Sequence, residues 1–272
     1  MNKPIGIFDS GVGGLTVARE VFKLLPQEDV VYFGDVGRYP YGGRSKDIIT
    51  KFTEQDIAFL REHDVKFIIC ACNTASSVAI DDISKDSDIP IIGVIRPGAM
   101  AAIRKTKNER IGVIGTHATI NSNAYARIIH ETDPHLKVFS LACPLFVPLA
   151  EEGYIDKKAT YLIAQDYLQT MLDVGIDTLI LGCTHYPLMK NVIQNVVGND
   201  IALIDSGEET ARFAYKLMVE QGLLDTDASQ IPIPEGEHKF YVSDVPEKFT
   251  QVASRFLGYP VEKVTRVNVS GY

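Results

Sequence analysis

Residues 67–74 read Phe-Ile-Ile-Cys-Ala-Cys-Asn-Thr, and residues 178–185 read Thr-Leu-Ile-Leu-Gly-Cys-Thr-His. Each segment is a short apolar run that leads to a cysteine and then to a polar residue. The two cysteines, Cys72 and Cys183, stand 183 − 72 = 111 positions apart. Residues 5–11 and 111–117 form a similar pair, with an offset of 112 − 6 = 106 between their glycines. Self-similarity at a nearly constant spacing indicates a repeated unit.

These segments belong to two series of apolar runs that are rich in Val and Ile and separated by longer stretches of helical period. Such runs are typical of parallel strands buried on both faces of a sheet. The first series predicts strands at Pro4–Phe8, Val30–Gly34, Lys66–Cys70 and Pro90–Val94. The second predicts strands at Arg110–Gly115, Lys137–Leu141, Asp177–Leu181 and Ala202–Asp205. Intervening segments such as Ser45–Glu62 predict helices, so the fold class is α/β.

The same strand order in both series predicts two pseudo-symmetric parallel-sheet α/β domains with the active site at their interface. We expect the first domain to comprise residues 1–97 plus 208–272, because a tail with a helix (Glu208–Gln221) and a strand (Lys239–Ser243) crosses back onto it. The second domain then comprises residues 98–207. Ligand sites of parallel sheets lie beyond the carboxyl ends of the strands. Two symmetric halves therefore bring Cys72 and Cys183 to opposite sides of one ligand.

Composition limits the function classes. The chain has 272 residues and a formal net charge of −8, and its basic residues are scattered. This argues against a nucleic-acid partner, because phosphate contacts need clustered Lys and Arg. No apolar run reaches the roughly 18–20 residues of a membrane span, and the apolar stretch before Asp9 is too short for a signal peptide. We therefore expect a cytoplasmic protein with no membrane partner, whose four cysteines are free thiols.

The cysteine pair carries the candidate chemistry. Cys72 and Cys183 each follow a predicted buried strand and precede a predicted helix start, where backbone N–H groups lower the pKa of a thiol. Buried cysteines often serve only as small hydrophobic residues, and this description suits Cys70 and Cys143 better. Two cysteines at equivalent positions of a duplicated chain favour a catalytic role instead.

Other polar residues lie near the same strand ends. Asp9 opens a Gly-rich turn, residues 9–14, that matches neither a P-loop nor a dinucleotide fingerprint. A purely structural turn is an equally good explanation there, but the Asp9 carboxylate is suited to hold an ammonium group or assist a thiol. His185 lies two residues after Cys183, close enough to exchange protons with it. Thr116 and Thr119 fit a helix N-cap and the residue one turn later, and Glu151 is either a functional or a surface carboxylate.

Together these segments resemble bacterial glutamate racemases. The resemblance rests on residues 9–17 (Asp-Ser-Gly-Val-Gly-Gly-Leu-Thr-Val), 40–42 (Pro-Tyr-Gly), 72–76 (Cys-Asn-Thr-Ala-Ser) and 182–185 (Gly-Cys-Thr-His), and extends in order from Ile5 to about residue 215. The family interconverts L- and D-glutamate without pyridoxal phosphate and supplies D-glutamate for peptidoglycan.

The resemblance also implies roles for individual residues. It makes Cys72 and Cys183 the catalytic pair, with Asp9, Glu151 and His185 as supporting acid/base groups. It implies that the substrate-binding residues are Asp9, Ser10, Pro40, Tyr41, Gly42, Asn73, Thr74, Thr116, Thr119, Thr184 and His185. It further implies glutamate as the small-molecule partner, no cofactor, no metal and a homodimer.

The chemistry suits two thiols. Racemisation removes the Cα proton from one face and returns a proton to the other, so one base is needed on each face, in opposite protonation states. Donors aimed at the α-carboxylate stabilise the developing carbanion. Because the chain is acidic and the substrate is an anion, we expect backbone N–H groups at helix starts to supply local positive potential.

Three alternatives stay open at this stage. A racemase of the same superfamily acting on aspartate, or on a broader set of amino acids, differs only in pocket shape. A cysteine hydrolase or amidase needs one nucleophile with its histidine and leaves the second cysteine idle. The third is a metal-binding or non-catalytic thiol protein, in which Cys70, Cys72, Cys183 and His185 could form a zinc site.

Overall fold

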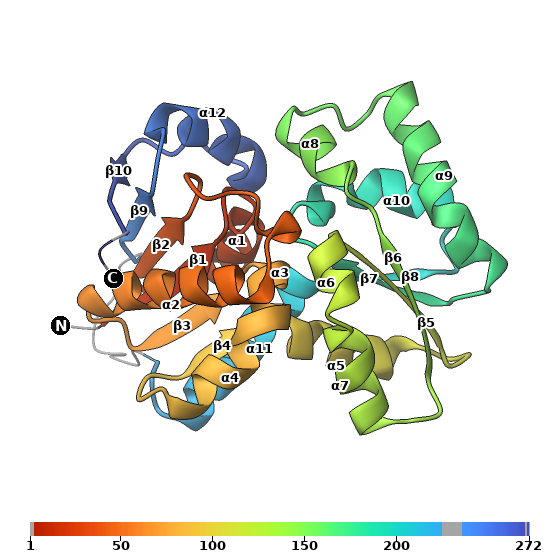
Figure 1. The fold of residues 1–272 in the computed structure, drawn as a ribbon, viewed down its shortest axis with the longest axis horizontal. Coiled ribbons are helices and arrows are strands. Elements are labelled where there is room, and N and C mark those ends of the chain that lie inside the picture. Colours follow the sequence, from red (N-terminus) through yellow and green to blue (C-terminus); the bar gives the residue numbers. More distant parts are fainter. Residues whose placement is uncertain (1–2, 225–235, 270, 272) are drawn as a thin grey trace.

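The computed structural model describes residues 3–224, 236–269 and 271. Two parallel β-sheets lie side by side, each covered by helices (Figure 1). The first sheet has the order β10-β9-β2-β1-β3-β4. Its strands are β1 (Ile5–Asp9), β2 (Val30–Gly34), β3 (Phe67–Cys70), β4 (Ile91–Gly93), β9 (His238–Val242) and β10 (Val264–Arg266). The second sheet has the order β6-β5-β7-β8. Its strands are β5 (Arg110–Gly115), β6 (Lys137–Ala142), β7 (Thr178–Gly182) and β8 (Ala202–Asp205).

Twelve α-helical segments connect these strands within the described residues. They are α1 (Leu15–Leu24), α2 (Lys46–Glu62), α3 (Asn73–Ala75), α4 (Asp81–Ile83), α5 (Ile95–Lys105), α6 (His117–Asn121), α7 (Ala124–Thr132), α8 (Phe146–Glu151), α9 (Lys158–Asp173), α10 (Lys190–Val197), α11 (Ser206–Glu220) and α12 (Pro246–Leu257). A π-helical stretch, Ser76–Ile80, joins α3 to α4, and short 3₁₀ turns lie at Tyr41–Gly43, Ser84–Asp86 and Tyr186–Met189. The predicted α/β fold class is confirmed.

Three apolar clusters hold these layers together. The largest contains side chains of both sheets, among them Ile7 of β1 and Ile180 of β7, so the two halves share one core. Helix α1 packs against α11, α11 against α5, and α5 against α7, which forms the helical layer between the sheets. A second cluster fills the outer side of the second sheet, and a third lies between α2 and the first sheet. Strands β1, β2 and β7 are buried along their whole length, as expected for parallel strands between helical layers.

The register of the strands supports the duplication that the repeat predicts. The order β2-β1-β3-β4 in the first sheet corresponds to β6-β5-β7-β8 in the second. Gly6 of β1 pairs with Ile68, and Gly112 of β5 pairs with Leu179. The offset between these partners is 179 − 68 = 111, the same offset that separates Cys72 from Cys183. The two cysteines therefore follow equivalent strands at equivalent positions.

The C-terminal tail returns to the first half. Strand β9 pairs in parallel with β2, and β10 extends the same sheet beyond β9, while α12 packs against α1. In Figure 1 these blue elements lie beside the red N-terminal strands. Helix α11 spans the two halves, since it contacts both α1 and α5. Strand β10 is an addition to the predicted elements.

Candidate active site

A cavity of about 310 Å³ lies beyond the carboxyl ends of both sheets. Its walls come from both halves of the chain, and both cysteines line it. The other predicted site residues in its lining are Ser10, Pro40, Tyr41, Gly42, Asn73, Thr74, Thr116, Thr184 and His185. Three predicted residues, Asp9, Thr119 and Glu151, lie outside this lining: Thr119 and Glu151 each lie within hydrogen-bond distance of a lining residue, and Asp9 directly precedes Ser10.

Cys72 sits at the start of a helical segment. Its sulfur accepts a hydrogen bond from the backbone N–H of Ala75 at 3.5 Å, and its thiol donates to Ser10 Oγ at 3.4 Å. The prediction that this position lowers the pKa of the thiol is wrong. Burial, together with the nearby Asp9 carboxylate, raises the pKa of Cys72 to about 12, although Ser10 and Ala75 act in the predicted direction. At neutral pH, Cys72 is therefore a thiol that can donate a proton.

On the opposite strand end, Cys183 faces a charged histidine. Its sulfur lies 3.8 Å from His185 Nδ1, and His185 Nε2 lies 2.9 Å from Glu151 Oε1. Burial opposes protonation of the imidazole, but the contacts with Cys183 and Glu151 outweigh it and raise the pKa of His185 from 6.5 to about 10. The two thiols therefore have different neighbours: Cys72 lies near a carboxylate, and Cys183 lies near an imidazolium.

This geometry makes the Glu151–His185 pair testable. Replacing Glu151 by glutamine removes a negative charge 2.9 Å from the ring, so the pKa of His185 is expected to fall by about one to three pH units. Because the raised pKa keeps the ring charged up to about pH 10, the variant should lose the imidazolium, and with it activity, at a lower pH than the wild type. Imidazole NMR titration and the pH dependence of kcat/KM measure both effects.

The neighbouring, exposed Glu152 provides the matched control for this substitution. Glu152→Gln should leave both profiles unchanged. An unchanged His185 titration in Glu151→Gln would show that the carboxylate does not hold the imidazolium.

Asp9 lies at the end of β1, almost fully buried. Its Oδ2 accepts the backbone N–H of Gly11 at 2.9 Å, whereas its Oδ1 has no hydrogen-bond partner among the described residues. Burial is the main reason that the pKa of Asp9 is raised, and the charge of His185 partly opposes this. An unsatisfied buried oxygen is costly. A substrate ammonium group would satisfy it.

The glycines in the turn after Asp9 allow the two halves of the chain to approach each other closely. A Cβ atom at Gly13 would lie 2.3 Å from Thr184 Oγ1 and 2.6 Å from the ring of His185. One residue on, a Cβ at Gly14 would lie 2.4 Å from Asp9 Cβ. The hydroxyl of Thr16 donates to the Thr184 carbonyl at 2.9 Å across the same contact. The turn therefore seats the Cys183 loop against the first half, which favours the structural explanation of these glycines.

Three threonines from both halves gather at another wall. Thr74 Oγ1 lies 3.0 Å from Thr116 Oγ1, and Thr119 Oγ1 lies 3.1 Å from Thr116 and 3.4 Å from Thr74. As predicted, Thr116 is an N-cap, because its hydroxyl accepts the backbone N–H of Thr119. Two helical segments, α6 and the one that begins at α3, thus start at the cavity. Helix starts and hydroxyl groups together favour a carboxylate.

The sequence prediction missed part of the lining. The additional residues are Tyr39, Gly43, His117, Pro144, Val147 and Pro148. Val147 and Pro148 lie on α8, and Glu151 was the only residue of this helix among the predicted site residues. Tyr39 contacts His185 with ring centroids 6.5 Å apart, and burial and Glu151 raise its pKa well above the usual value. Its position directly before Pro40, a predicted site residue, was the sequence signal that could have identified Tyr39.

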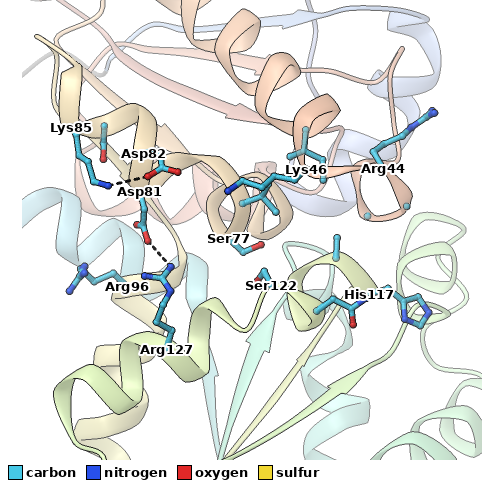
Figure 2. Close-up of a pocket in the computed structure, with 17 residues that line it drawn as sticks. Arg44, Lys46, Ser77, Asp81, Asp82, Lys85, Arg96, His117, Ser122 and Arg127 are labelled. Carbon is cyan, nitrogen blue, oxygen red and sulfur yellow. Dashed lines mark hydrogen bonds and ion pairs between the residues drawn. The ribbon is translucent and has the colours of Figure 1, made fainter.

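A wider cleft of about 1090 Å³ adjoins the cavity and shares Gly42, Gly43 and His117 with it. Figure 2 shows its charged side chains, with the ion pairs Lys85–Asp82 and Arg127–Asp81 on one side. The cleft also contains three cations, Arg44, Lys46 and Arg96, that make no ion pair within the described part of the chain. The acidic protein thus places positive charge beside the cavity in addition to its helix starts.

The described residues contain no group of three or more His, Cys, Asp or Glu side chains arranged to hold a metal ion. The donor set therefore does not favour the zinc alternative. Within the same residues, no helix combines the length and hydrophobicity needed to cross a bilayer.

Known proteins resemble the chain over nearly its whole length. A glutamate racemase of Geobacter metallireducens is 47% identical over 267 residues, which cover 98% of this chain and 97% of the relative. The chain belongs to the glutamate racemase family. Residues 24–214 also match the family model described as Asp/Glu/Hydantoin racemase.

Solved structures of the family have the same fold. The glutamate racemase isoform RacE1 of Bacillus anthracis superposes with a TM-score of 0.92 at 40% identity, covering 98% of this chain and 97% of its own. A glutamate racemase of Francisella tularensis, solved in complex with D-glutamate, gives a TM-score of 0.91 at 42% identity, covering 100% of this chain and 99% of its own. The predicted resemblance and the predicted two-sheet architecture are therefore confirmed.

Proposed function

We propose that this protein interconverts L- and D-glutamate without a cofactor, with Cys72 and Cys183 as the acid and the base on opposite faces of Cα. One observation carries the proposal: two cysteines at register-equivalent strand ends line a single cavity between the halves. The family membership, and the D-glutamate bound in the Francisella tularensis relative, support glutamate as the substrate. By resemblance, the D-glutamate product serves peptidoglycan synthesis.

The reaction needs only proton transfers. The Cys183 thiolate removes the Cα proton of L-glutamate, and the Cys72 thiol delivers its own proton to the opposite face, which gives D-glutamate. After one turnover Cys183 carries the proton and Cys72 is the thiolate, ready for the reverse reaction or for proton exchange. The raised pKa of Cys72 supports its role as the initial donor.

The remaining site residues position the substrate and stabilise charge. In this proposal the unpartnered Asp9 oxygen, with Ser10, receives the substrate ammonium group. The threonine cluster (Thr74, Thr116 and Thr119) and the helix starts beside it bind a carboxylate. Pro40, Tyr41, Gly42, Asn73 and Thr184 complete the wall, while Glu151 holds His185 next to Cys183. Closing these donors around the substrate stabilises the carbanion.

Chiral chromatography tests the proposal directly. Purified protein incubated with L-glutamate should generate D-glutamate up to an equal mixture, and it should act far more slowly on L-aspartate. Activity is expected to survive dialysis against a chelator without added pyridoxal phosphate, because two thiols suffice for the proton transfers. Loss of activity on dialysis, or a visible absorbance band from bound pyridoxal phosphate, would contradict cofactor independence.

The Cys183–His185–Glu151 contacts also favour a second candidate, a cysteine hydrolase, since such enzymes use a thiol, a histidine and an orienting group. That function would leave Cys72 idle on the other wall. A trapped acyl-enzyme on Cys183, with no racemisation, would support it over the racemase.

Three further expectations accompany the proposal. The domain limits, residues 1–97 plus 208–272 and residues 98–207, are supported by the return of β9 and β10 to the first sheet. A homodimer remains a prediction from the resemblance, which light scattering on the eluting protein would test. The cytoplasmic location likewise remains a prediction from the sequence.

A further inference from the structure

A buried cluster of charged groups lies behind the Pro40–Gly43 wall of the cavity. Two carboxylates, Asp35 after β2 and Asp56 on α2, are fully buried there, and the Tyr41 hydroxyl contacts both. Arg38 is the only cation in contact with them among the described residues. Its Nε donates to Asp35 Oδ2 at 2.6 Å, and its Nη2 donates to Asp56 Oδ1 at 2.8 Å.

The number of hydrogens in this cluster is too small for its contacts if both carboxyl groups are ionised. The Tyr41 oxygen lies within hydrogen-bond distance of Asp35 Oδ2 and, at 3.0 Å, of Asp56 Oδ2. A phenol has one hydrogen, so it can donate fully to only one of them. The other contact joins two oxygens and needs a second proton. If Tyr41 donates to Asp35, then Asp56 must donate to Tyr41.

The charge count leads to the same result. Two ionised carboxylates and one guanidinium leave a net negative charge on two carboxyl groups that are fully buried, which is costly. Burial and the neighbouring Asp35 raise the pKa of Asp56 well above its usual value, although Arg38 and Tyr41 oppose this. The Asp9 carboxylate acts in the same direction as Asp35.

We propose that Asp56 retains its proton at neutral pH and is a positioning residue, whose O–H group holds Tyr41 and thereby its neighbours Pro40 and Gly42, which bind the substrate in the proposed function. The inference rests on the proposed racemisation for its kinetic consequences but not for the protonation itself. Among the hydrogen bonds of the described residues, Tyr41 is the cavity-lining partner of Asp56.

The route from Asp56 to the substrate is short. Tyr41 begins the 3₁₀ turn that carries Gly42, and a Cβ at Gly42 would lie 3.2 Å from Thr116 Cβ in the other half. A displaced Tyr41 would therefore move Gly42 relative to the threonine cluster, which weakens substrate binding. Ionisation of Asp56 at alkaline pH has the same effect, because both carboxylates then face the Tyr41 oxygen and Arg38 neutralises only one of them.

Infrared difference spectroscopy of the whole protein tests the protonation. The wild type at neutral pH should show the carbonyl stretch of a buried carboxylic acid, and Asp56→Asn should lack that band. Asp35→Asn removes the negative charge that favours the protonated form of Asp56, so this variant should also lose the band, and the kinetic variants below assign the proton to Asp56. A wild-type spectrum that does not differ from Asp56→Asn in this region would overturn the proposal.

Kinetics test the positioning role. In the wild type, KM should rise at alkaline pH as Asp56 ionises. Asp56→Asn keeps an uncharged group whose N–H can donate to Tyr41, so its KM should stay within about two-fold of the wild-type value at neutral pH and should not rise at alkaline pH. Asp56→Leu removes the donor and should raise KM about ten-fold, with a smaller change in kcat, because a buried polar partner is left unsatisfied. Equal KM values for the asparagine and leucine variants would overturn the proposal.

Thr53→Val is the matched control, since Thr53 is fully buried on the same helix and its hydroxyl donates only to the Ile49 carbonyl. It should change thermal stability without changing KM or its pH dependence. If Asp56→Leu does not fold, the spectra and kinetics of Asp56→Asn still decide. If the wild type does not racemise glutamate, the proposed function fails, while the infrared band still tests Asp56.

Discussion

Replacing either Cys72 or Cys183 by serine is expected to lower kcat for glutamate racemisation by about 10²–10⁴-fold, the usual contribution of one acid/base group. At neutral pH a serine hydroxyl forms far less of the anion that acts as a base than a cysteine thiol does. Racemisation needs a working acid/base group on each face of Cα. Each substitution changes one atom in a buried wall, so the cavity should persist. Chiral chromatography of each variant measures the loss.

A half-reaction distinguishes two bases from one. A glutamate analogue with a leaving group on Cβ needs only one base: removal of the Cα proton forms the Cα–Cβ double bond as the leaving group departs. Each serine variant keeps one thiol, so it should eliminate from a single enantiomer, and the two variants should choose opposite ones. From the resemblance, we expect Cys72 to act on the D form and Cys183 on the L form.

Cys143→Ser is the control for this pair, because Cys143 is a buried thiol that does not line the cavity. It should racemise glutamate at close to the wild-type rate. Elimination from the same enantiomer by both catalytic-site variants, or near wild-type racemisation by either, would refute the two-thiol mechanism. In heavy water, the wild type should place deuterium in product faster than in recovered substrate.

Gly13→Ala is expected to be nearly as damaging, although Gly13 carries no chemistry. Its new Cβ would lie 2.3 Å from Thr184 Oγ1 and 2.6 Å from the His185 ring, well inside van der Waals contact. Such overpacking costs about 1–3 kcal/mol of stability. Because the loop that must move also carries Cys183, a displacement of about 1 Å should lower kcat/KM by roughly 10²-fold.

The comparison variant is Gly43→Ala, since a Cβ at Gly43 meets no atom within 4 Å. It should change kcat/KM by less than about three-fold, as expected for a substitution that creates no clash. Thermal unfolding of both variants separates the packing cost from the loss of activity. Wild-type activity in Gly13→Ala would mean that the two halves do not need this close contact.

The sequence predicted the strands well because buried parallel strands have a strong signal. Val30–Gly34, Arg110–Gly115 and Ala202–Asp205 have the predicted bounds, and the other predicted strands differ by one residue at one or both ends. Strand β10 was missed because it is three residues long and largely exposed at the sheet edge. An edge strand of this kind lacks the continuous apolar run that marks an interior strand.

The positions of site residues at strand ends were predicted well, whereas properties that depend on burial, such as pKa values, were predicted less well. The repeat located Cys72 and Cys183, and their shared cavity follows from the sheet topology. The pKa of Cys72 was predicted in the wrong direction, because the sequence shows a helix start but not the depth of burial or the nearby Asp9. The contact between Glu151 and His185 likewise depends on how α8 folds over the second sheet.

Thermodynamics limits how far the unequal surroundings of the two cysteines can favour one direction of the reaction. Mirror-image substrates have equal free energies in water, so the equilibrium constant between them is one. The ratio of kcat/KM in the two directions equals this constant, whatever lies behind each thiol. Asp9 beside Cys72 and His185 beside Cys183 therefore cannot make the protein a one-way catalyst. They can only divide each kcat/KM differently between binding and turnover, so that the two enantiomers saturate the protein at different concentrations.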